Sequence, residues 1–310
     1  MWTVETQYFP ISPTGCGVIS YSDQDKSSIP ETFDARDNWS DCTSPIRTQA
    51  GCGSCWAQVS SGVYADRLCV ASNETIKQTL SPQYLIDCSD NCRAGTDTSN
   101  PLNCNNGCYG GYIDLTLQFI NSHGIVNEQC YQYEASENTC PSQCGDGTPI
   151  DSVTLLNGGS CNTYASLSDV QLDIMKNGPV IATFTLYQQF KDYDGGVFSL
   201  SGSPEALEGH AARVIGWGVD NGVPYWTAAN SWGSGWGEHG FFRIRRNTNE
   251  LGFEKNFIST TVDVSSIDSK YYGSSWNENL NSSNNLLPPT GILFMIILFY
   301  LIIVPIIASF

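Results

Sequence analysis

The chain has 310 residues, enough for one large domain or two smaller ones with packed cores. Its hydrophobic content of 41% and aromatic content of 12% exclude a largely disordered chain. A formal net charge of −17, with only 14 Lys and Arg residues, argues against nucleic acid as a partner, because phosphate binding needs clustered basic side chains.

The first segment, residues 1–28, is polar and rich in turn-forming residues, and we interpret it as the remainder of a leader or propeptide. It has no basic cluster followed by an apolar run, so it does not predict a signal peptide. Asn-X-Ser/Thr triplets at Asn38, Asn73 and Asn281 are nevertheless typical of a secretory glycoprotein. A start further upstream would reconcile these two observations.

Helices are predicted in the first half of the structured region. Apolar residues between Trp56 and Val70 recur at helical spacing, which predicts a helix that begins at or just after Cys55. Two further helices are predicted over residues 114–120 and 166–176.

Strands are predicted in the second half, where four short runs are rich in β-branched and aromatic residues: 180–186, 211–219, 224–229 and 240–246. The order of elements therefore predicts an α+β protein with a helical N-terminal lobe and an antiparallel β C-terminal lobe.

The C-terminal part divides into two segments. Residues 264–290 are rich in Ser and Asn and predict a polar linker. Residues 291–310 are uncharged and mostly apolar, which predicts membrane attachment rather than a buried core helix. A transmembrane helix and a glycolipid-anchor signal both remain open, and small residues near 281–283 slightly favour the lipid anchor.

The chain contains 13 cysteines, an odd number, and only 3 histidines. This density predicts disulfides formed in an oxidising compartment, with one thiol left unpaired. The close cysteine pairs have no histidine near them, so we expect no metal and no cofactor. The expected location is the secretory pathway, with the lysosome, endosome or cell surface as destination.

The most informative segment is Gln49-Ala50-Gly51-Cys52-Gly53-Ser54-Cys55-Trp56. A helix N-terminus stabilises a thiolate through its free N–H groups and partial positive charge, and the thiolate is the nucleophilic form. We therefore interpret Cys55 as the unpaired nucleophile. The side-chain N–H of Gln49 and the backbone N–H of Cys55 are the expected donors to an oxyanion that forms on the substrate.

A thiolate mechanism also needs a base, and His210 is the histidine best placed for that role. It enters a predicted strand among small residues, whereas His123 lies at a helix end and His239 at a strand-entry turn. Asn230 ends the next predicted strand, where its side-chain oxygen could accept a ring N–H and orient the imidazole.

These segments resemble the papain family of cysteine peptidases over about residues 29–263. The motifs that carry the resemblance are Cys52-Gly53-Ser54-Cys55-Trp56, Gly209-His210-Ala211 and Asn230-Ser231-Trp232-Gly233. Residues 107–112 and 209–219 are most similar to cathepsin B. The resemblance implies a papain-like two-lobed fold with a barrel-like C-terminal lobe and the active-site cleft between the lobes. It also implies a monomer that hydrolyses proteins and peptides through a thioester.

The resemblance implies roles for the surrounding residues as well. Gly110 and Gly111 would pair with the substrate backbone, and Trp232 would shield the His210–Asn230 pair from water. The other implied substrate contacts are Gly53, Ser54, Tyr112, Gly209 and Asn256. The implied disulfides are Cys42–Cys69, Cys52–Cys108, Cys88–Cys140, Cys130–Cys144, Cys92–Cys104 and Cys16–Cys161.

Four features depart from the cathepsin B pattern. Residues 130–144 replace a histidine-bearing occluding loop but contain no histidine, which predicts an endopeptidase with an open cleft and no carboxy-dipeptidase activity. Asn256 stands where cathepsin B has a glutamate that accepts arginine, so a preference for basic residues is not expected there. Gln58 stands where phenylalanine is usual and is expected at a helix surface. No inhibitory propeptide of normal length precedes residue 29.

Two alternative functions remain open. A catalytically inactive, protease-shaped binding protein would usually lack the nucleophile, whereas Cys55, His210, Asn230 and Gln49 are all present. A peptide ligase would proceed through the same thioester, so the sequence does not separate hydrolysis from transfer to an amine.

Overall fold

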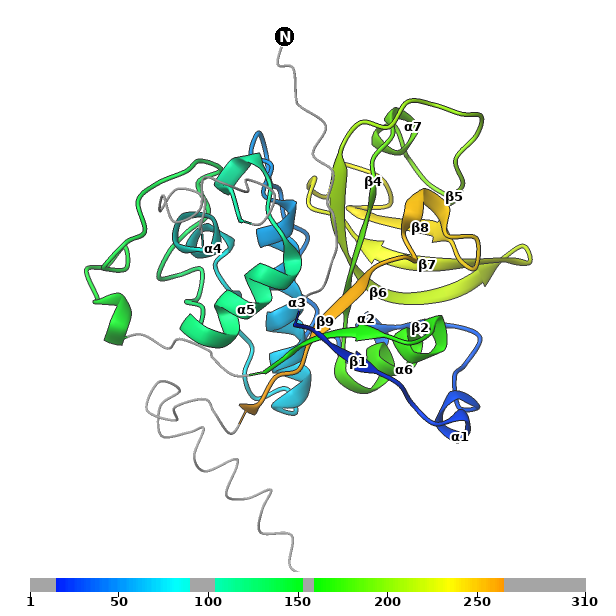
Figure 1. Cartoon of the computed structure of the whole chain (residues 1–310), viewed down its shortest axis with the longest axis horizontal. Coiled ribbons are helices and arrows are strands. Elements are labelled where there is room, and N and C mark those ends of the chain that lie inside the picture. The colour runs from blue at the N-terminus through cyan, green and yellow to red at the C-terminus, as the bar shows by residue number, and fades with distance from the viewer. Residues whose placement is uncertain (1–14, 90–103, 153–158, 265–310) are drawn as a thin grey trace, which may run out of the picture. The chain divides into compact units, whose positions relative to one another are not determined.

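The computed structural model describes residues 15–89, 104–152 and 159–264. In this part of the chain, helices of the N-terminal half lie beside a sheet built mainly from the C-terminal half (Figure 1). The α+β class predicted from the order of the elements is therefore confirmed.

The helical lobe contains α3 (Cys55–Ala71), α4 (Pro82–Cys88) and α5 (Ile113–His123). Helix α3 begins at Cys55, as the apolar spacing predicted. Helix α4 was not predicted, although it has clear start signals: Pro82 occupies its first turn and the Ser81 hydroxyl accepts a hydrogen bond from the N–H of Tyr84.

The sheet lobe is organised around the antiparallel strands β4 (Val180–Thr185), β6 (Gly209–Asp220), β7 (Val223–Ala229) and β8 (Phe241–Arg245). The full strand order is β1-β3-β9-β4-β6-β7-β8-β5, with β2 also paired to β6. The outer strands are β1 (Gly17–Ile19), β2 (Phe33–Asp34), β3 (Cys161–Tyr164), β5 (Val197–Phe198) and β9 (Phe257–Thr260). Within the described residues the sheet does not close into a barrel, which is compatible with the barrel-like lobe expected from the sequence.

Apart from α3, α4 and α5, the described helices are short, and α6 (Leu167–Asn177) is the longest of them. It starts directly after Ser166, whose hydroxyl accepts from the N–H of Asp169. The remaining turns of helix are α1 (Asp23–Lys26), α2 (Ala35–Asn38), η1 (Gly107–Tyr109), η2 (Ile150–Ser152), α7 (Gln188–Lys191) and η3 (Glu250–Gly252).

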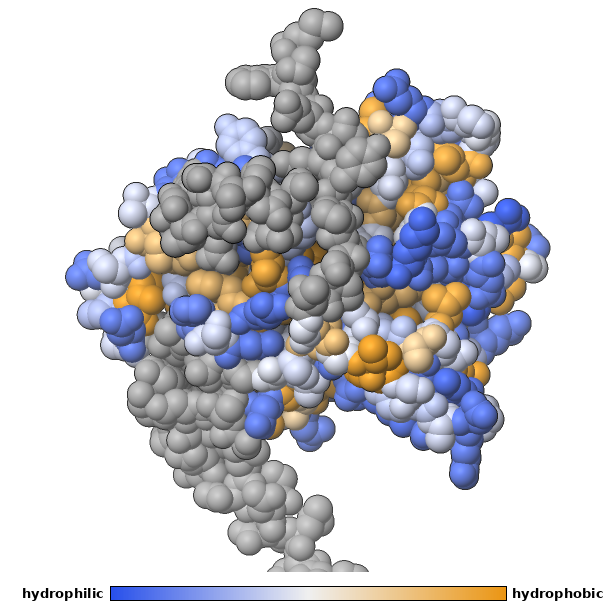
Figure 2. Space-filling view, viewed as in Figure 1, coloured by the Kyte–Doolittle hydropathy of each residue, from blue (hydrophilic) through white to orange (hydrophobic). Residues whose placement is uncertain are grey.

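The core of the sheet lobe is rich in aromatic side chains. Phe190 is fully buried and packs edge-to-face against Phe184, Phe198 and Phe242, with ring centroids 4.9–5.2 Å apart. On the face shown in Figure 2, hydrophilic residues occupy much of the coloured surface and hydrophobic residues form smaller areas between them. The described exposed large hydrophobic residues are Val18, Tyr109 and Val219.

Helix α3 is covered on all sides, and 15 of its 17 residues are buried, because it packs against α4 and α5 and also against β6. Two of its charged residues are consequently buried and paired with the sheet lobe. Asp66 binds Arg213 of β6 at 2.6 Å, and Arg67 binds Asp173 of α6. These pairs fix α3 against the strands that follow it in the sequence.

Residues 15–28, interpreted above as a leader remnant, are bonded to the sheet lobe. Strand β1 pairs in parallel with β3, and the disulfide Cys16–Cys161 joins the same two segments. The hydroxyl of Tyr21 donates to Asp173, the residue that also binds Arg67. This part of the N-terminal segment therefore packs as a strand and helix of the folded unit.

The structure contains five disulfides of the pattern implied by the family resemblance: Cys16–Cys161, Cys42–Cys69, Cys52–Cys108, Cys88–Cys140 and Cys130–Cys144. The sixth implied pair includes Cys92, which lies outside the described residues.

The predicted C-terminal membrane segment, residues 291–310, also lies outside the described residues, as does nearly all of the linker before it. In the described part of the chain, no helix has the length and apolarity needed to cross a membrane.

The buried ion pair of α3 and β6 generates a stability prediction. Arg213→Met should lower the free energy of unfolding by about 3–5 kcal/mol, because it leaves the Asp66 carboxylate buried without its partner. Chemical denaturation measures this change. Lys77→Met, in the exposed pair of Lys77 with Asp41, is the control and should change stability little. Equal stability of the two variants would contradict the role given to the buried pair.

Candidate active site

Cys55 is the first residue of α3 and is free; no other described cysteine is. The loop before it is held by the disulfide Cys52–Cys108 and by a 2.8 Å hydrogen bond from the N–H of Gly53 to the Cys108 carbonyl. A Cβ at position 53 would lie 2.5 Å from that carbonyl oxygen, which explains the glycine. The loop thus fixes the start of the helix and with it the position of the thiol.

The Cys55 thiol is only 5% exposed. Burial raises its pKa to about 12, although the backbone N–H groups of Ala211 and Trp56 act in the opposite direction by hydrogen bonding to the sulfur. The contact with Ala211 places the sulfur next to the first residues of β6. A thiol in this environment stays protonated until a neighbouring base accepts its proton.

His210 lies at the start of β6, directly before Ala211. Its Nε2 forms a 2.8 Å hydrogen bond with Oδ1 of Asn230. Because an amide oxygen only accepts, this bond places the proton of the neutral ring on Nε2 and leaves Nδ1 as the basic nitrogen. Trp232 stacks on the ring, with the two ring centroids 4.8 Å apart. The Phe184 ring packs against it in a T-shaped arrangement, with centroids 5.4 Å apart.

The imidazole is 2% exposed, and this burial lowers the His210 pKa to about 4, against the opposing effects of the Asn230 hydrogen bond and the nearby Glu208 carboxylate. The ring is therefore neutral at pH 7. In the described residues no hydrogen bond joins the Cys55 thiol to the ring. Burial thus favours the protonated thiol and the uncharged imidazole, and Asn230 already orients the ring.

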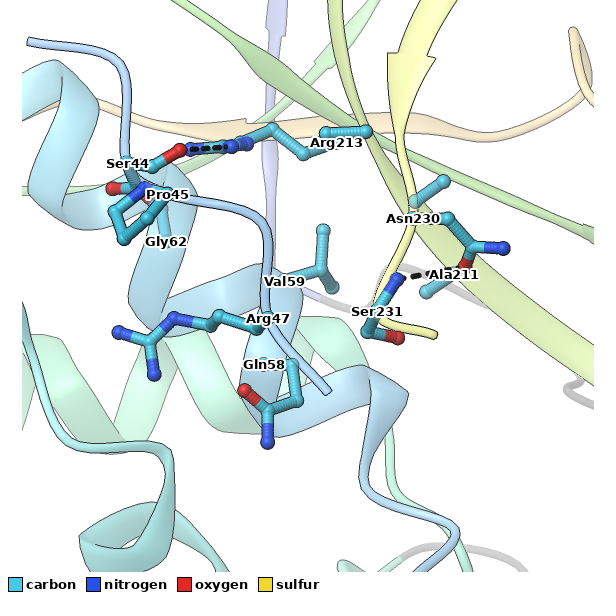
Figure 3. A pocket seen from close by; sticks show the side chains of 12 residues that line it. Ser44, Pro45, Arg47, Gln58, Val59, Gly62, Ala211, Arg213, Asn230 and Ser231 are labelled. Atoms are coloured by element: carbon cyan, nitrogen blue, oxygen red, sulfur yellow. Dashed lines mark hydrogen bonds between the residues drawn. The ribbon is translucent and has the colours of Figure 1, made fainter. Parts of the chain in front are cut away.

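Gln49 is connected to Asn230 through Ser231, a link that the sequence motifs did not reveal. The Ser231 hydroxyl donates to Oε1 of Gln49 at 2.6 Å, and the Ser231 N–H donates to Oδ1 of Asn230 at 2.8 Å. Figure 3 shows the second of these bonds. The Gln49 Nε2 donates one hydrogen to the Cys52 carbonyl at 3.0 Å and keeps a second hydrogen.

Tyr133 is a second residue that the sequence analysis missed. Its hydroxyl donates to the backbone carbonyl of Gln49 at 2.7 Å and lies 2.7 Å from the Ser54 hydroxyl. It belongs to the segment between Cys130 and Cys144, which was analysed only for its lack of histidine. No local pattern marks this tyrosine, because its partners are distant in the sequence.

The residues implied as substrate contacts have varied environments. Gly110 and Gly111 are buried, and a Cβ on Gly111 would lie 2.5 Å from the Trp56 ring. Ser54 is also buried, whereas Tyr112 and Gly209 are partly exposed at the starts of α5 and β6. Asn256 lines a hollow of about 340 Å³ that includes none of Cys55, His210 and Asn230.

The other two histidines are far less enclosed than His210. His123 is exposed and stacks on Phe119, and His239 lies in an exposed turn with φ of 57°. No group of three or more His, Cys, Asp or Glu suited to a metal ion occurs in the described ranges. The site therefore offers a nucleophile, an oriented base and N–H donors, which is the set required for acyl transfer through a thioester.

Comparison with known sequences gives matches over most of the chain. A family profile described as "Papain family cysteine protease" matches residues 29–261. "Cathepsin B-like cysteine proteinase 5" of Caenorhabditis elegans is 34% identical over 292 residues, which cover 80% of both chains. The "Gut-specific cysteine proteinase" of the same organism is 35% identical over 259 residues, covering 77% of this chain and 75% of the relative.

Solved structures of similar fold include precursors. The structure titled "proCathepsin B S9 from Trypanosoma congolense" has a TM-score of 0.72 and 25% identity, covering 84% of this chain and 87% of its own. "Recombinant stem bromelain precursor" has a TM-score of 0.64 and 26% identity, covering 80% of this chain and 75% of its own.

The burial of His210 generates a prediction about the pH dependence of stability. Its pKa is about 4 in the folded chain and about 6.5 when unfolded, so the unfolded state binds the proton first as pH falls. The contribution of the neutral His210 ring to the free energy of unfolding is therefore present above pH 6.5 and is lost as pH falls toward 4. Between pH 7.5 and pH 4.5, wild type should lose about 2 kcal/mol more unfolding free energy than His210→Gln.

Urea denaturation at the two pH values measures this difference. His123→Gln is the control, because that ring is exposed, and it should follow wild type. If His210→Gln and wild type lost the same free energy of unfolding on acidification, the assignment of a buried neutral ring to His210 would be wrong.

Proposed function

The chain belongs to the papain family of cysteine proteases and is cathepsin B-like, and we propose that it cleaves peptide bonds with Cys55 as nucleophile, His210 as base and Asn230 as the residue that orients the ring. The observation that carries this proposal is the 2.8 Å bond from His210 Nε2 to Asn230 Oδ1, beside a free cysteine at a helix N-terminus. That bond leaves Nδ1 available for the thiol proton.

In the proposed first step the proton of the Cys55 thiol moves to Nδ1 of His210. Each charged form alone is disfavoured by burial, but the thiolate and imidazolium attract one another strongly in a site of low polarity. The thiolate attacks the substrate carbonyl carbon and forms a C–S bond. The imidazolium then protonates the departing amine, and water hydrolyses the thioester with the ring acting again as base.

The proposed oxyanion donors are the backbone N–H of Cys55 and the second hydrogen on Gln49 Nε2. The first hydrogen on that nitrogen is bound to the Cys52 carbonyl, and Ser231 holds the amide oxygen, so the amide is already oriented. Donors fixed before the reaction stabilise developing negative charge without reorganisation.

The substrate backbone is proposed to pair with the Gly110-Gly111 segment, with Gly53, Ser54, Tyr112, Gly209 and Asn256 as further contacts. Trp232 is proposed to keep water from the His210–Asn230 hydrogen bond, which is supported by its stacking on the ring.

The proposed mode of cleavage is endopeptidase without carboxy-dipeptidase activity. An enzyme that removes dipeptides must recognise the substrate carboxylate, and a positively charged group is the natural partner for it. The loop closed by the disulfide Cys130–Cys144 has no histidine, lysine or arginine in its sequence.

The family and the cathepsin B-like relatives support a secreted or lysosomal protease. We further propose that residues 291–310 attach the protein to a membrane, as their apolar composition suggests.

Fractionation of cells that express the full chain tests this attachment. The full chain should pellet with membranes, and a chain ending at residue 290 should not. Equal distribution of the two proteins would refute the attachment.

Substitution of the nucleophile and base tests the proposed chemistry. Cys55→Ala and His210→Ala should each lower kcat on a peptide-amide reporter by more than about a thousandfold, because the two groups act as a unit. His123→Ala, outside the site, should retain wild-type activity. Turnover by Cys55→Ala equal to that of wild type would rule the mechanism out.

The cleavage mode is tested with one peptide in two forms, with a free and with an amidated C-terminus. Mass spectrometry of the products should show the same internal cut in both, since no contact to the terminal carboxylate is proposed. Release of C-terminal dipeptides from the free form alone would contradict the endopeptidase assignment.

A further inference from the structure

Gln58 lies one helical turn after Ser54, on the same face of α3. It was expected at a helix surface, but it is 3% exposed, because α3 is covered by both lobes. Within the described residues neither atom of its side-chain amide has a hydrogen-bond partner. A buried amide without partners costs about 1–3 kcal/mol, so its presence beside the nucleophile needs a physical reason.

The Tyr133 hydroxyl is the polar group beside this face of α3, since it lies 2.7 Å from the Ser54 hydroxyl, one helical turn before Gln58. Burial raises the pKa of this hydroxyl, and the side chains of Ser54 and Gln58 oppose the rise. A tyrosine hydroxyl has one hydrogen and can accept two hydrogen bonds. Its hydrogen goes to the Gln49 carbonyl and one acceptor position faces Ser54, which leaves one position for an N–H of Gln58.

The Gln58 side chain borders a small unfilled space. It lines a cavity of about 30 Å³ together with Arg47, Val59 and Ser231 (Figure 3). The residues of the segment before the nucleophile are held much more tightly, because Gln49 binds Ser231 through both its backbone and its side chain.

We propose that Gln58 is a positioning residue for the oxyanion donor Gln49. Its Nε2 donates to the Tyr133 oxygen when substrate binds, which completes the chain Gln58–Tyr133–Gln49 and fixes the segment before Cys55. This inference rests on the proposed proteolytic function. Gln49 is proposed to bind the oxyanion, which forms only during the reaction and is absent from the bound substrate. Loss of the Gln58 amide therefore lowers kcat and leaves KM nearly unchanged.

A double-mutant cycle with Gln58→Met and Tyr133→Phe tests the proposal. Each single variant should lower kcat about fivefold, the size expected from one hydrogen bond, with KM within about twofold of wild type. The double variant should be no slower than the slower single variant, because both changes break the same chain. Wild-type kcat for Gln58→Met, or losses that multiply in the double variant, would overturn the proposal.

Ser60→Ala is the matched control. Ser60 is buried on the same helix and its hydroxyl also lacks a partner among the described residues, so it has no hydrogen bond to Tyr133 or Gln49. Its kcat should equal that of wild type. Thermal unfolding of every variant separates lost positioning from lost folding.

A crystal structure with a peptide aldehyde bound to Cys55 provides a readout that does not depend on turnover. The proposal expects Gln58 Nε2 within about 3.2 Å of the Tyr133 oxygen. A separation beyond hydrogen-bonding distance would overturn it even if wild type cleaves peptides. Absence of cleavage by wild type would instead refute the proposed function.

Discussion

The ion pair between Asp66 and Arg213 is the constraint on which the geometry of the site depends, because it joins the two elements that carry the proposed nucleophile and base. Asp66 lies on the helix that begins with Cys55, and Arg213 lies three residues after His210 on β6. Both side chains are almost completely buried, so neither can exchange its partner for water. Since a helix and a strand are stiff, this ion pair and the hydrogen bond from the Ala211 N–H to the Cys55 sulfur together restrict where the thiol lies relative to the ring.

Burial of this contact explains the charge state of the site. The same packing that encloses α3 removes water from the thiol and the imidazole, and it therefore shifts the pKa of Cys55 upward and that of His210 downward. Burial favours an uncharged resting pair, and a charged pair is favourable only when both charges form together. Asn230 orients the ring and Trp232 covers one of its faces, which would prepare it for the proposed proton transfer.

Features with local causes could be predicted from the sequence. The start of α3 at Cys55, the N-cap of α6 at Ser166 and the four central strands follow from periodicity, capping and β-branched residues within short windows. Gln58 was placed wrongly for the opposite reason. Its neighbours on the helix do not reveal that a second lobe covers that face. Tyr133 and Ser231 were missed because each contacts Gln49 across a long stretch of chain. The packing of residues 15–28 likewise depends on a disulfide with distant Cys161.

The rate of Cys55 alkylation by uncharged iodoacetamide, measured against pH, tests most directly whether the His210 ring takes the thiol proton. The account predicts that wild type reacts at a nearly constant rate between about pH 5 and pH 8, because the neutral His210 ring accepts the thiol proton as the sulfur attacks. In His210→Gln the rate should be low and should rise continuously with pH, because a buried thiol without a base ionises only at high pH. Identical pH profiles for wild type and His210→Gln would contradict the account.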